Sequence, residues 1–186
     1  MIEIVPYRLE WPGEFLALAQ SLRQAFGEKA LAIHHIGSTS VPGLDAKDIM
    51  DLQVTLASLE PSVDDDLARA GFGNAPLRID HCPPGRTLPP SELEKRFTNS
   101  QGRAANLHLR VRGRFNQRYP LLCRDYLRSH PFAAAAYAEI KRQLAQRFPD
   151  DAESYYAIKD PVFDVLMEGA EAWAKATQWS EPASDA

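Results

Sequence analysis

The chain has 186 residues, of which 45% are hydrophobic and 25% charged, and its formal net charge is −4. This length suits one well-buried domain, and the net charge excludes a uniformly basic nucleic-acid coat. No apolar run approaches the roughly 18 residues that cross a bilayer, no signal-peptide pattern is evident, and two cysteines argue against a disulfide framework. We therefore expect a cytoplasmic protein without membrane contact, with one domain over residues 1–179 and a frayed tail over 180–186.

Strand and helix patterns alternate in the first half of the chain. A short strand or extended arm at 2–5 precedes a helix from residue 11 to 26, where Pro12 fits an early helical position and apolar residues recur at helical spacing. Strands are expected at 31–36 and 48–56, on either side of a turn rich in glycine, serine and proline. A helix that starts at residue 62 or 64 should end before Gly71.

The second half begins with short strands and ends in helices. Strands are predicted around residues 77–80, 95–99 and 105–111. Helical spacing then follows from 119 to 126 and from 133 to 148, and a third helix is expected to break at Pro161, which opens a final helix. Strands with an early helix, followed by a helical C-terminal third, predict the α+β class.

The positive charge is concentrated in one segment. Residues 86–128 contain ten basic and three acidic side chains, a net of +7, which leaves −11 for the rest of the chain. Arginine dominates this segment, and its guanidinium group forms paired hydrogen bonds to phosphate and carboxylate. The segment therefore either binds an anionic ligand or is a solvated surface balanced by acids from elsewhere.

The stretch 33–54 contains the most informative motif. A strand ends at Gly37-Ser38, and the next strand exposes Asp51 after an entry that carries Lys47. A Gly-Ser turn lets the backbone approach a phosphate closely, and a carboxylate on the adjacent strand can hold the Mg²⁺ that accompanies nucleoside triphosphates. The alternative is a simple glycine-proline turn beside a solvent-facing Asp51.

The same stretch resembles a known family. The run from His35 to Leu44, His-Ile-Gly-Ser-Thr-Ser-Val-Pro-Gly-Leu, followed by Lys47 and Ile49-Met50-Asp51-Leu52, looks like the signature of the GrpB family. The resemblance continues along most of the chain, from about residue 4 to 166. It includes the segments Glu10-Trp11-Pro12, Arg96-Phe97, Leu107-His108-Leu109, Arg124-Asp125-Tyr126-Leu127-Arg128 and Tyr156 to Lys159.

The GrpB family is similar in fold to the nucleotidyltransferase superfamily, and some members are fused to dephospho-coenzyme A kinase. The resemblance implies a mixed β-sheet flanked by helices, with Gly37-Ser38 at the triphosphate and Asp51 as the first metal-binding carboxylate. An active superfamily member has a second carboxylate two residues later, where this chain has Gln53. Two-metal chemistry needs bridging ligands, and Gln53 is a poor substitute for a bridging carboxylate, although Asp51 with His108 or His35 could hold one metal.

The predicted site consists of residues with three roles. The catalytic candidates are Asp51 and His108, and Asp51 is the metal ligand. Phosphate or ligand binding is assigned to Gly37, Ser38, Thr39, His35, Lys47, Arg96 and Arg124, with Lys159 as a weaker candidate. Each histidine and lysine could instead be a packed or surface residue.

Two functions from different classes follow. The first is binding of a nucleotide or other phosphorylated ligand, with Mg-dependent nucleotidyl or phosphoryl transfer if the site is catalytic. The second is a non-catalytic nucleotide or coenzyme sensor that supports an enzyme of coenzyme A biosynthesis. RNA binding through the basic segment is a less favoured third, which would weaken steeply with salt. The pattern leaves the oligomeric state open.

Overall fold

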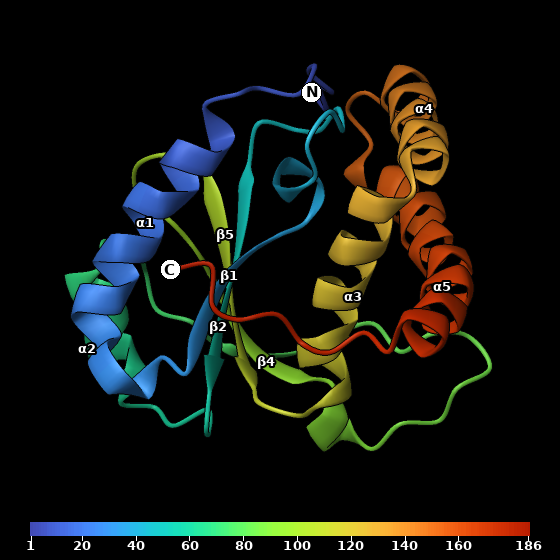
Figure 1. The fold of residues 1–186 in the computed structure, drawn as a ribbon. Helices are drawn as coiled ribbons and strands as arrows, with labels where there is room; N and C mark the ends of the chain where they lie inside the picture. Colours follow the sequence, from blue (N-terminus) through green and yellow to red (C-terminus); the bar gives the residue numbers. More distant parts are fainter.

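A five-stranded mixed sheet separates two groups of helices in the computed structural model, which describes residues 1–186 (Figure 1). The spatial order is β1-β2-β5-β4-β3. Only β2 and β5 are parallel, and the other three pairs are antiparallel. The strands are β1 (Ala32–Ile36), β2 (Met50–Leu56), β3 (Leu77–Ile79), β4 (Glu94–Asn99) and β5 (Ala105–Val111).

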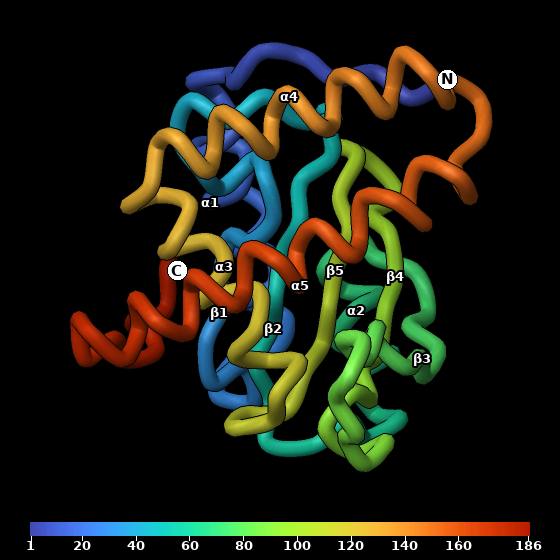
Figure 2. Tube along the Cα trace, turned by 90° about the vertical axis from the view of Figure 1, so that its right-hand side faces the viewer, coloured from blue at the N-terminus to red at the C-terminus, as the bar shows by residue number.

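Helices cover both faces of this sheet. One face is covered by α1 (Trp11–Phe26) and α2 (Val63–Arg69), and the other by α3 (Phe115–Ser129). Beyond α3, α4 (Pro131–Arg147) and α5 (Ala152–Thr177) form an outer layer that crosses in front of the strands in Figure 2. The predicted α+β class with a helical C-terminal third is confirmed. None of the helices combines the length and the apolar character that a membrane span requires.

The alternation of side chains assigns each strand residue to one of two cores. Met50, Leu52, Leu107 and Leu109 are fully buried and pack with Trp11 and its neighbours on α1. The residues between them on β2 and β5 are polar and turn toward α3. A second core holds α3, α4 and α5 together, so the polar face of the sheet lies between two apolar layers.

Pro161 does not divide the last helix. Contrary to the sequence expectation, α5 continues from Ala152 through Pro161 to Thr177, and Asp151 caps its start by accepting a hydrogen bond from the Ser154 amide. An internal proline costs about 3 kcal/mol. Buried residues stand on both sides of it, Tyr155 before and Met167 after, and packing of this stripe offsets that cost.

The final residues are ordered against the sheet. Residues 180–186 were expected to fray, but they lie along the outer edge of β1, where the backbone amide of Asp185 donates to the carbonyl of Ile33 at 3.0 Å. Composition could not reveal this, because the contacts join residues about 150 positions apart. Of the two expectations for residues 2–5, a short strand or an extended arm, the structure has the arm, with one bridge between Val5 and Ala46.

Candidate functional site

The two parallel strands supply the polar floor of the site. Asp51 lies opposite Asn106 and Gln53 lies opposite His108 in the register of β2 and β5. Because side chains alternate along a strand, these residues and Arg110 project from the face turned toward α3. Adjacent parallel strands therefore bring residues more than 50 positions apart into one row.

A cavity of about 280 Å³ lies between this floor, α3 and α5. Aromatic and aliphatic side chains form part of its wall, and charged and polar groups form the rest. An apolar wall with a few converging polar groups is typical of small-molecule sites. The charged residues are Asp51, Asp80, Lys95, Arg110, Arg124, Lys159 and Asp160.

Gly37 makes room for the Asp51 carboxylate. Its φ of 69° and ψ of −172° lie in a region that only glycine adopts readily. A Cβ atom at this position would overlap Asp51 Oδ2 and stand 2.9 Å from Asp51 Cβ. The backbone conformation and the lack of room for a side chain therefore both require glycine at this position. Its absence of a side chain lets the turn lie directly against the Asp51 carboxylate.

His108 is neutral, and its Nε2–H group faces Asp51. Its Nδ1 atom faces Lys95 Nζ at 3.2 Å and Arg110 Nη2 at 3.3 Å. Both are donors only, so Nδ1 accepts and the proton resides on Nε2, which is 3.7 Å from Asp51 Oδ1. Burial and the charge of Arg110 lower the pKa of His108 to about 4.

Asp51 is held in its charged form. Asn106 Nδ2 donates to Asp51 Oδ1 at 2.8 Å. Burial favours the neutral acid, but contact with His108, the Asn106 hydrogen bond and the charge of Lys47 together hold the pKa of Asp51 below its ordinary value.

Asp80 anchors a second cluster on the same floor. Its carboxylate accepts from Arg110 Nε at 3.0 Å and Asn116 Nδ2 at 3.1 Å, and it pairs with Lys95. Burial would raise the pKa of Asp80, and the charges of Arg110 and Lys95 outweigh it and lower that pKa. Arg110 Nη1 also donates to Gln53 Oε1 at 2.7 Å.

This donor set does not fit a magnesium centre. No group of three His, Cys, Asp or Glu side chains is arranged to hold a metal ion. Gln53 stands at the position of the second carboxylate. Its side-chain oxygen accepts a hydrogen bond from Arg110, and its side-chain amide donates to the Gln117 carbonyl. The protonated Nε2 of His108 is not a metal ligand in this arrangement.

The Gly37-Ser38 turn has free donors and a buried cation behind it. None of the backbone hydrogen bonds uses the amides of Ser38 or Thr39, although Lys141 Nζ donates to Ser38 Oγ at 2.9 Å. Lys141 also contacts the Asp45 carbonyl. Burial, and then the charge of Lys159, lowers the pKa of Lys141 to about 7.

The sequence profile of the family described as GrpB protein matches residues 1–169. The chain belongs to the GrpB family. A crystal structure of the conserved protein GrpB from Enterococcus faecalis superposes with a TM-score of 0.74 at 28% identity, over 92% of this chain and 99% of that one. This GrpB-family protein therefore has a nucleotidyltransferase-like fold, as the resemblance implied.

Curated relatives of this GrpB-family protein include longer chains. A dephospho-CoA kinase of Mycolicibacterium paratuberculosis is 34% identical over an alignment of 200 positions, which covers 96% of this chain and 48% of that protein. The UPF0157 protein BH1888 of Halalkalibacterium halodurans is also 34% identical, over 92% of this chain and 83% of its own length. The chain spans about half the length of the first relatives it matches.

Five of the predicted site residues of the GrpB-family protein line the cavity: Gly37, Ser38, Asp51, His108 and Arg124. Lys159, the weaker candidate, lines it as well. The roles assigned to these residues stay predictions.

The other four predicted residues lie outside this lining. Arg96 is on the opposite face of the sheet, where it binds Asp64 and the carbonyls of Glu60 and Ala75. His35 stacks on Phe15 of α1 and hydrogen-bonds to the buried Thr39. Lys47 contacts the Tyr156 hydroxyl and lies over its ring.

Sequence reasoning missed Asp80, Lys95, Arg110 and Lys141 as site residues. Lys95 and Arg110 are in the basic segment, and Arg110 shares the strand face of His108, so alternation was the available signal. Lys141 lies at helical spacing between Tyr137 and Leu144, on the buried face of α4. A lysine at an otherwise apolar position of a helix was the available signal for a buried charge.

The stability of the protein should report the titration of Lys141. Between pH 7 and 10.5 the unfolded chain holds a proton on Lys141 that the folded chain has released. The free energy of unfolding should therefore rise with pH across this window, by at most about 1.4 kcal/mol per pH unit. In urea titrations at several pH values, Lys141→Met should abolish this rise in the free energy of unfolding with pH. Lys175→Met, at an exposed position, should leave the rise unchanged. Parallel pH profiles for Lys141→Met and the unmodified protein would contradict the assignment.

Proposed function

We propose that this GrpB-family protein binds a phosphorylated small molecule in the cavity, with a phosphate group at the Gly37-Ser38 turn. The observation that supports this most directly is the pair of unused backbone amides at Ser38 and Thr39 beside a glycine of positive φ. Successive free amides of this kind form an anion-binding concavity. The Ser38 hydroxyl, which accepts from Lys141, is free to donate its own proton to a phosphate oxygen.

Charge on the cavity wall supports the same ligand class. Lys95, Arg110 and Lys159 line the cavity. Lys95 and Arg110 pair with Asp80, and Lys159 pairs with Asp160, and in this proposal their remaining N–H donors contact a polyanion. Phe115, Tyr119 and Phe163 provide an apolar surface for the remainder of the molecule. This combination suits a nucleotide better than a free inorganic ion, because a base or another flat group can occupy the aromatic wall.

The metal-free donor set favours binding over metal-dependent transfer. Asp51 is the carboxylate that contacts the turn, while His108 presents a protonated Nε2 and the Gln53 oxygen already accepts from Arg110. The relatives named dephospho-CoA kinase make a coenzyme A precursor the first ligand to test. In this proposal the protein senses or holds such a compound for a partner enzyme of coenzyme A biosynthesis.

Thermal unfolding with dephospho-CoA, ATP and pyrophosphate, each in magnesium or in EDTA, tests the proposal. A ligand at about a hundred times its Kd adds about 2.7 kcal/mol, which raises the Tm of a chain of this size by about 5–10 °C. We expect this rise in EDTA as well as in magnesium. No rise with any phosphorylated compound would overturn the proposal.

Asp51→Asn separates anion binding from metal chemistry. The substitution removes a negative charge near the phosphate position and keeps an oxygen that can accept from Asn106. Metal-free binding should become several-fold tighter, whereas magnesium-dependent binding should be lost. The exposed Asp65→Asn is the matched control and should change neither. Binding that needs magnesium and disappears in Asp51→Asn would instead favour nucleotidyl or phosphoryl transfer.

A further inference from the structure

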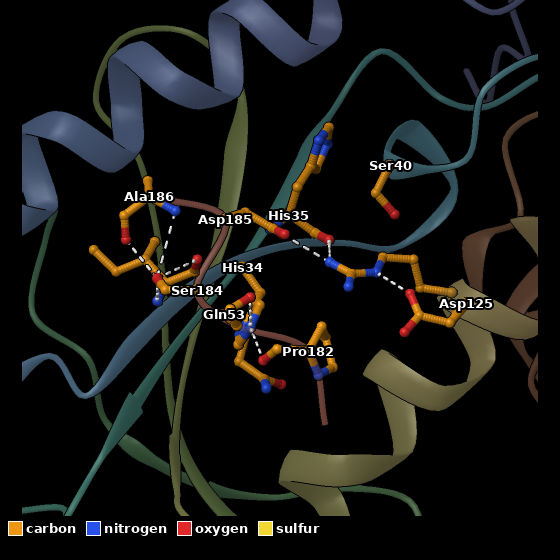
Figure 3. A network of polar contacts seen from close by, with 12 residues as sticks. His34, His35, Ser40, Gln53, Asp125, Pro182, Ser184, Asp185 and Ala186 are labelled. Atoms are coloured by element: carbon orange, nitrogen blue, oxygen red, sulfur yellow. Dashed lines mark hydrogen bonds and ion pairs between the residues drawn. The ribbon is translucent and has the colours of Figure 1, made fainter. Parts of the chain in front are cut away.

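The outer edge of β1 is covered by the last residues of the chain. Figure 3 shows Pro182, Ser184, Asp185 and Ala186 beside His34 and His35. β1 is the terminal strand of the sheet, so its outward backbone groups have no strand partner. The segment 182–186, here called the edge segment, supplies partners for them in a sheet-like manner.

Each outward backbone group of β1 has a specific partner. Ile33 N–H donates to Ser184 Oγ at 2.8 Å, and the Ile33 carbonyl accepts from the Asp185 amide at 3.0 Å. His35 N–H donates to Asp185 Oδ2 at 2.9 Å. The His35 carbonyl accepts from Arg124 Nη1 at 2.9 Å. The edge segment thus uses one serine and one aspartate to satisfy three of four backbone groups.

Arg124 makes the edge selective for an acidic segment. Its side chain is 1% exposed, and Nη1 also donates to Asp185 Oδ2 at 2.7 Å. The other carboxylate against it is Asp125, which accepts from Nε at 2.8 Å. Removal of one partner of a buried ion pair is strongly destabilising, because it leaves the other charge uncompensated. Asp185 is therefore recognised by its charge and by the β1 backbone together.

The receiving surface and its occupant belong to different parts of the chain. β1 and Arg124 lie within residues 1–169, where the family match is found, and the edge segment lies beyond it. Extended segments that add to a sheet edge take affinity from backbone hydrogen bonds and specificity from side-chain contacts. Both kinds of contact are present at β1.

We propose that the β1 edge with Arg124 is a binding site for an extended peptide segment that carries a Ser-Asp pair, filled here from within the chain by the edge segment. An external peptide of the same chemistry takes the same place when the edge segment leaves. The edge segment is tethered, with an effective concentration in the millimolar range, so it acts as a built-in competitor. The peptide site lies on the outer edge of β1. Arg124 also lines the cavity, but peptide binding at this edge does not depend on the proposed phosphate position.

Fluorescence anisotropy with a labelled peptide of residues 180–186 tests the proposal on the full-length chain. Asp185→Lys in the protein places two cations together and should release the edge segment. The peptide should then bind at least tenfold more tightly to this variant than to the unmodified protein. Hydrogen exchange at the amides of Ile33 and His35 should be faster in the variant without peptide and slow again when the peptide is added.

Two matched controls define the result. Glu168→Lys makes the same charge change at an exposed position on α5 and should bind the peptide as weakly as the unmodified protein. A peptide with Asn in place of Asp185 should lose most of its affinity for the Asp185→Lys variant. Equal binding by the two protein variants, equal binding of the two peptides, or no binding at all would overturn the proposal.

Discussion

Gly37→Ala should lower the free energy of unfolding by about 2–6 kcal/mol. A backbone conformation reserved for glycine costs about 1–3 kcal/mol for another residue, and Gly37 has a φ of 69° and a ψ of −172°. The added methyl group would also overlap the Asp51 carboxylate, which adds the cost of overpacking, about 1–3 kcal/mol. Urea denaturation monitored by tryptophan fluorescence measures the sum.

Gly43→Ala separates the two costs. Gly43 has a φ of 79°, but a Cβ atom there would meet nothing within 4 Å. It should therefore show the conformational cost alone. Asp51→Ala in the Gly37→Ala background should recover part of the loss, since coupled sites are not additive. Equal destabilisation by Gly37→Ala and Gly43→Ala would show that Asp51 does not press on the turn.

The strand pattern was predictable where alternation is strict. β5 was expected at 105–111 and occurs there, because leucines alternate with Asn106, His108 and Arg110. The same alternation correctly indicated that Asp51 and Gln53 share a face of β2. The continuous α5 and the ordered edge segment were not predictable, since both depend on packing between residues far apart in the chain.

The candidate site was predictable only where its members belong to adjoining strands. Gly37, Asp51 and His108 reach one cavity because β1, β2 and β5 are neighbours. Arg96 turned to the other face because it pairs with Leu109, whereas Phe97 pairs with His108. This register between β4 and β5 is not encoded in either strand alone. Asp80 comes from a loop, whose path depends on the whole fold.

Arg110→Met should destabilise the protein by about 3 kcal/mol. The side chain of Arg110 is buried and donates to Asp80 and Gln53, so its removal leaves a buried carboxylate and an amide oxygen with fewer partners. The loss should shrink in acid. The pKa of Asp80 is lower in the folded protein than its ordinary value of 3.8. The Asp80 carboxylate therefore stabilises the folded protein at pH values above 3.8, and this contribution is lost as the pH falls through the folded-state pKa. Arg112→Met, at an exposed position, is the control.

The same substitution should change the titration of His108. Burial, and then the charge of Arg110, lower the pKa of His108 to about 4, so without that charge the pKa should rise, while burial keeps it below 6.5. An NMR titration of the imidazole C–H resonances measures this, and an unchanged pKa would contradict the assigned contact. Arg110→Met combined with Asp80→Asn should regain stability relative to Arg110→Met alone, because the uncompensated charge is then removed. It should leave the pKa of His108 raised, because loss of the Asp80 charge, which favours protonation, only partly offsets loss of the Arg110 charge. Stability and histidine titration would thereby respond differently to the two charges of one cluster.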